Sequence, residues 1–296
     1  MQTQSCFFEK VLCAVELDHR SAAALYNSVG FAQPNGHLQV LTVEHASGHR
    51  ADVPASAVTR QALEDFVWRT IPSDLPYLPS VGFAVVVGNP DQEILRAANH
   101  LKADLVVVGT RGRGRLQEAI VGSVAHSVLR HSQVPVMVIP PFETELVSLE
   151  ATRPVFHLGR ILVPVDPLRV DANQLRVAAH LRRASHDQLL LLYVHRPGER
   201  AVDASELSDL AKRHNLSNAT AVASVTAGTV ADGIVEAARR EDAGLIIMGL
   251  ERRQQRMEPG AISYEVIRHT NAVVLTVPPS SHANIMKDGV APDVAR

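Results

Sequence analysis

The chain has 296 residues, of which 46% are hydrophobic and 20% charged, with a formal net charge of -2. This composition fits one large soluble domain or two of moderate size, and the near-neutral charge gives no sign of general binding to nucleic acid or to membranes. With only 4% aromatic residues, stacking platforms for single strands are not expected, and the apolar runs are too short to span a bilayer.

The amino terminus, MQTQSCFFEK, lacks a basic start followed by an apolar core, so no export signal is expected. Cys6 and Cys13 form neither a CxxC motif nor a disulfide framework. Cys13 lies within an apolar strand, where we expect a buried thiol. A reducing cytoplasm fits these features best.

Along the chain, short runs of Val, Ile and Leu alternate with longer amphipathic segments, the pattern of βαβ units and a parallel sheet. Strands are predicted in the first half near residues 10–16, 38–43, 81–87, 104–108 and 134–139, and helices near 20–30, 53–70, 90–102 and 122–132. Strands are predicted in the second half near residues 160–165, 188–194, 220–226, 244–248 and 272–277, and helices near 171–184, 203–214, 229–241 and 260–269. With right-handed crossovers, this order predicts an α/β fold with two doubly wound domains, each an open parallel sheet of five strands with helices on both faces. Ligands of such folds bind beyond the carboxyl ends of the strands.

The two halves repeat each other. KVLCAVELD at residues 10–18 returns as RILVPVDPL at 160–168, and matching blocks follow in the same order at 88–109 and 228–249, and at 128–141 and 266–279. Such repetition indicates a duplication. We therefore predict a first domain over residues 1–141, a polar linker without clear periodicity at 142–158, a second domain over 159–280 and a loosely ordered tail at 281–296.

Glycines are concentrated after the fourth strand of the first half. Gly109 ends that strand, Gly112 follows, and Gly122-Ser123 begins a helix nine residues later. Glycine allows positive φ and a close approach of backbone N–H groups to a ligand, and the first N–H groups of a helix attract anions. Ser123 could cap this helix or donate its hydroxyl to a phosphate. The pattern predicts a phosphate-binding loop that is neither a Walker motif nor GxGxxG on the first strand, although structural reasons alone can place glycines at strand ends.

The sequence GTRG, nine residues and then GS resembles the glycine pattern of the universal stress protein family. The first strands, VLCAVE and ILVPVD, and the last strand, VPVMVIP, support the resemblance, which covers both halves of the chain. It implies a tandem member with the open five-stranded sheets already predicted. For chains that keep the glycine pattern it also implies ATP as the ligand, with or without Mg.

The resemblance also implies roles for single residues. The phosphates would lie against Gly109, Arg111, Gly112, Gly122, Ser123 and Val124, and Val108 is expected among the residues that bind the nucleotide. Glu16 occupies the position of an acid that holds the adenine or sugar edge, usually an aspartate, and its extra methylene is expected to alter base recognition. The backbone of Val43 would pair with the adenine edge, and Ala14 would line the base pocket. Arg113 and Arg115, outside the pattern, could screen the triphosphate or be solvated loop residues.

The second half departs from the glycine pattern. Gly249 and Gly260 match Gly109 and Gly122, but Arg252 stands at the second glycine position, Ala261 replaces the serine and the loop is two residues shorter. Side chains there would keep the backbone from a phosphate. Asp166 keeps the usual acid. We therefore place the nucleotide in the first half only.

Other groups of residues in the sequence are expected to have structural roles and not to form functional sites. The 14 histidines show no ligand spacing for a metal, and Arg130-His131 and Arg268-His269 are expected to complement helix carboxyl ends. No serine nucleophile elbow is present. The apolar last strand of each half would be exposed as an edge, so we expect the halves to pair there as an intramolecular pseudo-dimer. A further homodimer of whole chains stays open.

Three functions are compatible with these features. The first is an ATP-binding module of the cytoplasmic stress response whose nucleotide state alters contacts with a protein partner that the sequence does not identify. The second is a slow Mg-dependent ATPase, for which no carboxylate is placed to activate water. The third is a sensor or scaffold for a ligand other than a nucleotide. We expect a binding protein rather than an enzyme.

Overall fold

A computed structural model describes residues 8–44, 57–110, 121–140, 146–185, 187–216, 219–250, 252–253, 256–257 and 261–279. The elements of the first half are β1 (Phe8–Ala14), α1 (His19–Phe31), β2 (Ala32–Glu44), α2 (Ala57–Thr70), β3 (Ser80–Val87), α3 (Pro90–Leu101), β4 (Leu105–Gly109), α4 (Ser123–His131) and β5 (Val136–Ile139). The elements of the second half are β8 (Arg160–Pro164), α5 (Ala172–Ser185), β9 (Gln188–His195), α6 (Ala204–Arg213), β10 (Thr220–Val225), α7 (Val230–Arg240), β11 (Leu245–Gly249), α8 (Ala261–His269) and β14 (Val273–Val277). Two short hairpins add β6 (Val147–Leu149) with β7 (Pro154–Phe156), and β12 (Arg252–Arg253) with β13 (Arg256–Met257).

The alternation of strands and helices predicted from the apolar periodicity is confirmed. The largest difference is at β2, which begins at Ala32 instead of near residue 38. Its first residues continue the strand through an irregular register, in which Phe8 pairs with Ala32 and Lys10 with His37. The helix predicted from residue 53 is described only from Ala57 onward; residues 53–56 lie outside the described ranges.

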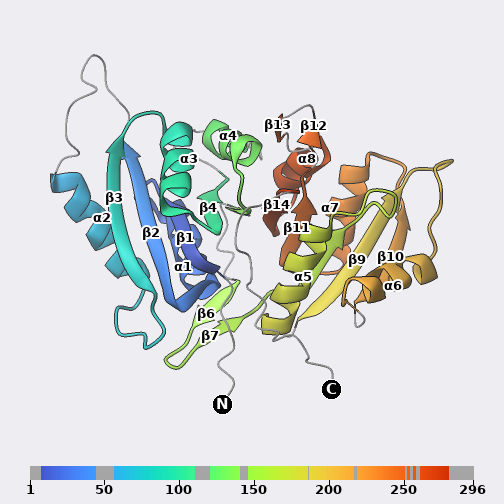
Figure 1. Ribbon diagram of the computed structural model, residues 1–296, viewed down its shortest axis with the longest axis horizontal. Helices are drawn as coiled ribbons and strands as arrows, with labels where there is room; N and C mark the ends of the chain where they lie inside the picture. Colours follow the sequence, from blue (N-terminus) through green and yellow to red (C-terminus); the bar gives the residue numbers. More distant parts are fainter. Residues whose placement is uncertain are drawn as a thin grey trace, which may run out of the picture.

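Ten strands form one sheet in the order β10-β9-β8-β11-β14-β5-β4-β1-β2-β3 (Figure 1). Within each half all pairs are parallel, and the two halves meet where β14 and β5 pair antiparallel. The expected pairing of the halves through their last strands is therefore confirmed. Thr276 Oγ1 also donates to the Val136 carbonyl at 3.2 Å.

The helices cover the two faces of this sheet. One apolar core lies under α1, α2, α5 and α6, and the other under α3, α4, α7 and α8 (Figure 1). Between α4 and α8, the rings of His126 and Tyr264 meet edge to face with centroids 4.8 Å apart, which adds a contact between the halves. Cys13 is fully buried, as expected, and burial raises the pKa of its thiol to about 12.

The predicted linker is partly folded. Its hairpin β6–β7 packs on α1, where Leu146 N donates to Asn27 Oδ1 at 2.8 Å and Leu149 N donates to the Tyr26 hydroxyl at 3.0 Å. Gly30 is required for this approach, since a Cβ there would lie 2.5 Å from a Val147 methyl. The strands have three residues each, which is too short for an alternating pattern to reveal them.

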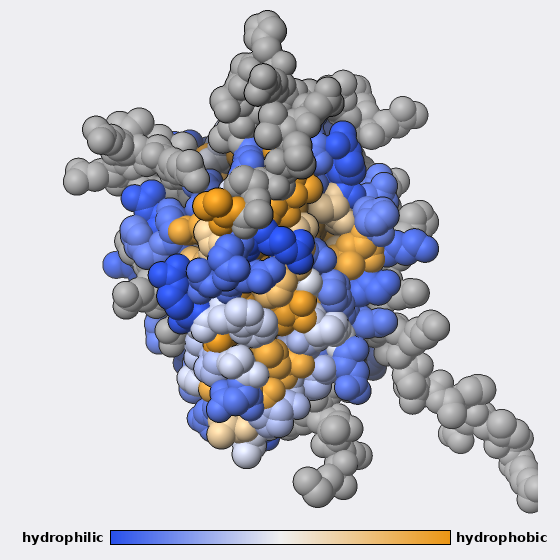
Figure 2. Space-filling view, turned by 90° about the vertical axis from the view of Figure 1, so that its left-hand side faces the viewer, coloured by the Kyte–Doolittle hydropathy of each residue, from blue (hydrophilic) through white to orange (hydrophobic). Residues whose placement is uncertain are grey.

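The end of the molecule that carries α2 and β3 exposes hydrophobic side chains among polar ones (Figure 2). Val58 is 78% exposed and Trp68 43%, and the indole ring packs edge to face on Phe83 at 5.9 Å between centroids. No helix in the described ranges is long and apolar enough to cross a bilayer.

The shared sheet predicts that the halves unfold together. Leu275→Ala, at a fully buried position of β14, should lower the free energy of unfolding by about 2–5 kcal/mol. Trp68, the single tryptophan, lies in the other half. The urea unfolding transition followed by its fluorescence should therefore move to a lower midpoint together with the transition followed by far-UV circular dichroism. Ile262→Ala, at a position 43% exposed, is the control and should change stability by no more than about 0.5 kcal/mol. An unshifted Trp68 transition in Leu275→Ala would show that the halves unfold independently.

Candidate functional site

The site of the first domain lies beyond the end of β1, which the sheet places between β4 and β2. β1 ends at Ala14, whereas β2 continues to Glu44 and β4 to Gly109. The register of β1 with β4 stops at the pair of Cys13 and Val107. This is the point where strand order reverses, which is where open α/β sheets bind their ligands.

The strands on either side of β1, β2 and β4, direct backbone groups over its end, and the hydrogen bonds of β2 show which residues do so. Val15 N donates to the Leu41 carbonyl on the β1 side at 2.9 Å, and Gly88 N donates to the Glu44 carbonyl on the β3 side at 3.0 Å. Backbone groups of successive residues point alternately to the two neighbours of a strand, so Val43, like Leu41, directs its N–H and C=O to the β1 side. That direction suits the role predicted for its backbone.

The same reasoning applies to β4. Thr110 N donates to the Ile139 carbonyl at 2.9 Å, on the β5 side. Gly109, one residue earlier, therefore directs its N–H and C=O to the β1 side, beyond the last residue pair of β1 and β4. Val43 and Gly109 thus face the same short stretch from opposite sides.

Four of the predicted residues lie on the same apolar face of the sheet. Ala14, Val43, Val108 and Val124, from four different elements, belong to or pack against the core under α3, α4, α7 and α8. Val108 is 4% exposed, and the other three are partly buried against the cluster. This cluster offers an apolar wall beside the polar backbone groups.

Gly109 and Gly122 have ordinary backbone conformations, and at Gly109 the missing side chain leaves room for a ligand. Among the described residues, Gly109 is absent from the glycines with positive φ, and no described heavy atom lies within 4 Å of a Cβ built on it. Gly122 has φ -58° and ψ 150°, which other residues can adopt. Gly109 therefore does not use the positive φ that glycine allows, while the expected room for a ligand remains.

Within the part of the chain that the structure describes, no side chain caps the amino terminus of α4. Gly122 is its N-cap, and Gly122 N donates to the Thr110 carbonyl at 2.6 Å. Capping by Ser123, one of its two predicted roles, is wrong, because Ser123 already belongs to the first turn and is exposed. By contrast, α1, α6 and α7 are capped by the side chains of Asp18, Asp203 and Thr229.

Thr110 was missed by the sequence analysis. Its Oγ1 is buried and has no hydrogen-bond partner within the described part of the chain, and the residue is 8% exposed. It lies between Gly109 and the amino terminus of α4, which its carbonyl holds. The sequence feature that could have pointed to Thr110 is its position between the two glycines of GTRG.

The remaining predicted residues divide in two groups. Glu16 is described: its N–H donates to Ser21 Oγ at 2.9 Å, and that hydroxyl donates to Asp18 Oδ1 at 3.0 Å, which fixes the loop between β1 and α1. Arg111, Gly112, Arg113, Arg115 and Gly260 lie outside the described residues.

The matching place in the second domain is occupied by its own side chains. Leu245 pairs with Ile161 as Leu105 pairs with Val11, so Gly249 corresponds to Gly109. A Cβ on Gly249 would lie 3.1 Å from both Asp171 Oδ2 and Gln174 Oε1. In the first domain, Asp18 caps α1 as Asp171 caps α5, and Ser21 has the place in α1 that Gln174 has in α5.

Gln174 is held tightly. Its Nε2 donates to the carbonyls of Pro164 and Ile247, both at 2.8 Å, so it bridges β8 and β11 beyond their last residue pair. Asp171 caps α5, with its Oδ1 accepting from Asn173 N at 2.9 Å and from Gln174 N at 3.3 Å. Burial raises the pKa of the Asp171 carboxyl.

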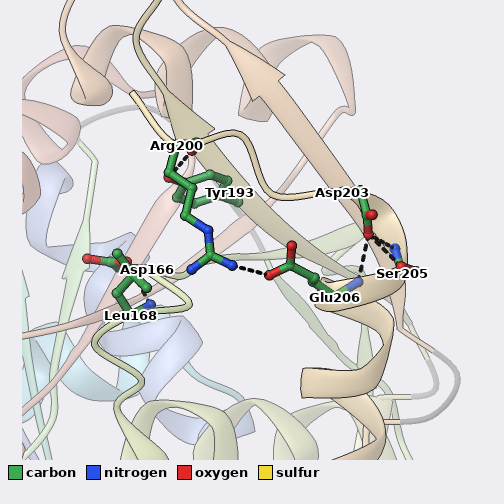
Figure 3. A network of polar contacts seen from close by, with 7 residues as sticks. All are labelled: Asp166, Leu168, Tyr193, Arg200, Asp203, Ser205 and Glu206. Atoms are coloured by element: carbon green, nitrogen blue, oxygen red, sulfur yellow. Dashed lines mark hydrogen bonds and ion pairs between the residues drawn. The ribbon is translucent and has the colours of Figure 1, made fainter. Parts of the chain in front are cut away.

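Asp166, the acid that the second half keeps, lies in a polar network at the ends of β8 and β9 (Figure 3). Its Oδ1 accepts from Leu168 N at 2.9 Å. Nearby, the Tyr193 hydroxyl donates to the Arg200 carbonyl at 2.9 Å, and the Arg200 guanidinium pairs with Glu206 at 2.8 Å. The side chains at this end of the second domain thus bond to one another and to their own loop.

Among the described residues, no group of three or more His, Cys, Asp and Glu side chains gathers as a metal site. Arg130 and His131, and Arg268 and His269, lie in the last turns of α4 and α8. There they complement the partial negative charge of the helix ends, as predicted.

Comparison with known proteins fits this architecture. The model of the universal stress protein family matches the chain twice, at residues 7–140 and 157–278. A universal stress protein of Thermus aquaticus is 30% identical over 138 residues, which are 45% of this chain and 98% of that protein. One of Methanocaldococcus jannaschii is 38% identical over 66 residues, 21% of this chain and 41% of that relative, so the match spans less than half of its length.

Solved structures show the same fold along nearly the whole chain. A universal stress protein from Archaeoglobus fulgidus is similar with a TM-score of 0.66 and 19% identity, over 95% of this chain and all of that one. A protein described as a putative universal stress protein from Pseudomonas aeruginosa has a TM-score of 0.61 and 16% identity, over 94% of this chain and 95% of that one. With its two matched domains, the chain belongs to the universal stress protein family.

Proposed function

We propose that the protein binds an adenine nucleotide, ATP, in its first domain only, and acts in the cytoplasm as a regulatory module of the stress response. The observation that carries the proposal is the convergence of backbone groups from Val43 and Gly109 over the end of β1, beside the uncapped amino terminus of α4. Free amides of a helix end and a strand end are donors that suit a phosphate chain.

The parts of the site have separate tasks under this proposal. The amides of Ser123 and Val124 would face the phosphates, because the first N–H groups of a helix have no partner within the helix. The hydroxyl of Thr110, which has no hydrogen-bond partner among the described residues, would supply one more donor. The apolar cluster with Ala14 and Val43 would hold the base, and the backbone of Val43 would pair with its edge.

The second domain differs in the groups it offers. Where no described atom lies near a Cβ on Gly109 in the first domain, the second has two acceptor oxygens over Gly249. A carboxylate there repels a phosphate. This contrast supports one nucleotide per chain.

The first test counts the nucleotide. Purified protein should release adenine nucleotide when denatured in perchloric acid, and isothermal titration of stripped protein should give one ATP per chain. Gly122→Val should weaken binding by at least about tenfold, since its side chain would displace phosphate from one charge-assisted hydrogen bond, worth about 1.5–3 kcal/mol. Gly260→Val is the matched control in the second half and should leave binding intact. Equal losses from both substitutions would rule out a single site.

The second test separates binding from folding. Gly109→Ala should leave the melting temperature of the nucleotide-free protein nearly unchanged, because its Cβ meets no described atom within 4 Å. The same Cβ should weaken ATP binding by about tenfold or more, the cost of losing one charge-assisted hydrogen bond. Gly249→Ala should do the reverse, lowering the melting temperature through its contacts at 3.1 Å and sparing ATP affinity. ATP binding that is unchanged in Gly109→Ala would remove β4 from the site.

A further inference from the structure

The second domain contacts the helix of the first domain that carries the proposed phosphate donors. The ring of Tyr264, in α8, meets the ring of His126, in α4, with centroids 4.8 Å apart and planes inclined at 70°. The short strand β13 of the second domain also lies beside α4 (Figure 1). The helix α4 thus belongs to the first domain by sequence and to the contact between the domains by position.

His126 lies one turn into α4. Its N–H donates to the carbonyl of Gly122, the N-cap, at 2.9 Å. Ser123 and Val124, whose amides would face the phosphates, lie between these two residues in the same turn. The direction of those amides and the position of the His126 ring are therefore set by one turn of helix.

His126 and Tyr264 occupy equivalent positions of the two halves, since residues 128–141 match residues 266–279 without a gap. Equivalent residues that contact each other lie on the axis that relates the two halves, so the contact is made once per molecule. In a dimer of identical domains the two residues on the axis would be the same. Duplication within one chain permits an imidazole in the first domain and a phenol in the second.

Tyr264 is held in place from its own side of the contact. The guanidinium carbon of Arg268, one turn later in α8, lies over the Tyr264 ring at 5.9 Å from its centroid. Arg268 Nη1 also pairs with Glu265 at 3.2 Å. The ring itself packs against the core that α4 and α8 share. It therefore offers a firm surface to His126, and an edge-to-face pair of this kind is stabilising beyond the area that it buries.

We propose that Tyr264 is a positioning residue for the nucleotide site of the first domain, acting on α4 through His126. The inference rests on the proposed function, because it concerns the same site. A helix that is already held in the binding orientation loses less conformational freedom when phosphate binds, so the affinity is higher. Coupling of this kind is reciprocal, so bound nucleotide would in turn hold α8, and the second domain would respond to the occupancy of the first.

Isothermal titration of the full chain with ATP tests the proposal. Tyr264→Ala should weaken binding by about two- to tenfold, the equivalent of one aromatic pair. Tyr264→Phe keeps the ring and should bind ATP as the unmodified protein does. His126→Ala should weaken binding to a similar degree. Adding Tyr264→Ala to it should cause no further loss, because both substitutions remove the same contact.

Leu275→Ala is the control for a general loss of stability. Leu275 is fully buried in the core on the opposite face of the sheet from α4 and α8. The substitution should lower stability and leave the ATP affinity of the folded protein unchanged.

Hydrogen exchange provides a second measurement, in the second domain itself. ATP should slow the exchange of the amides of α8 (Ala261–His269) in the unmodified protein, by a factor comparable to the loss of affinity in Tyr264→Ala. In Tyr264→Ala, ATP should leave this exchange unchanged.

The outcomes separate this inference from the proposed function. If the unmodified protein binds ATP and Tyr264→Ala binds it equally well, the inference is wrong and the proposed function stands. The same holds if Leu275→Ala loses as much affinity as Tyr264→Ala, or if the losses from His126→Ala and Tyr264→Ala add in full. If the unmodified protein binds no adenine nucleotide, the proposed function fails and the inference fails with it.

Discussion

The antiparallel pairing of β14 with β5 is the contact on which the architecture depends. Each half alone would expose a strand that is apolar along its whole length, with unpaired N–H and C=O groups. Paired with each other, both strands are almost fully buried, and two five-stranded sheets become one sheet of ten. The pairing also orients α4 toward α8, where His126 and Tyr264 meet.

The two domains share their strand arrangement but differ in the residues at the end of the first strand. In both domains the first strand ends early between two longer neighbours, and the chain reverses its order there. In the first domain no described side chain fills that place, which is lined by the backbone of Gly109 and by the amino terminus of α4. The second fills it with Gln174, whose amide joins β8 to β11, so a side chain there replaces the strand pairing that ends early.

Much of this could be predicted from the sequence, for definite physical reasons. The strands are buried on both faces, so their Val, Ile and Leu runs are continuous, and the helices between them are long enough to show their period. The hairpin of Val147–Leu149 and Pro154–Phe156 could not be found in this way, because its strands are too short and its stability comes from Asn27 and Tyr26 of α1.

The site of the first domain could likewise be predicted only in part. The glycine spacing indicated where a phosphate could lie, and the structure places Ala14, Val43, Val108 and Val124, from four separate elements, on the same apolar face of the sheet. The cap at Gly122 instead of Ser123, and the buried Thr110 hydroxyl, depend on where the helix begins and on what packs around the loop. The role of Gln174 depends on the gap between two strands, which no local pattern records.

The packed hairpin between the domains has a consequence for how the molecule behaves on dilution. A connection that is itself docked on α1 leaves the second domain little freedom to leave the first, so the local concentration of one last strand around the other is at least on the order of millimolar. Two separate single-domain chains would part once diluted below their dissociation constant. This chain keeps its paired arrangement at any concentration, and the site of the first domain therefore always has the other domain beside it.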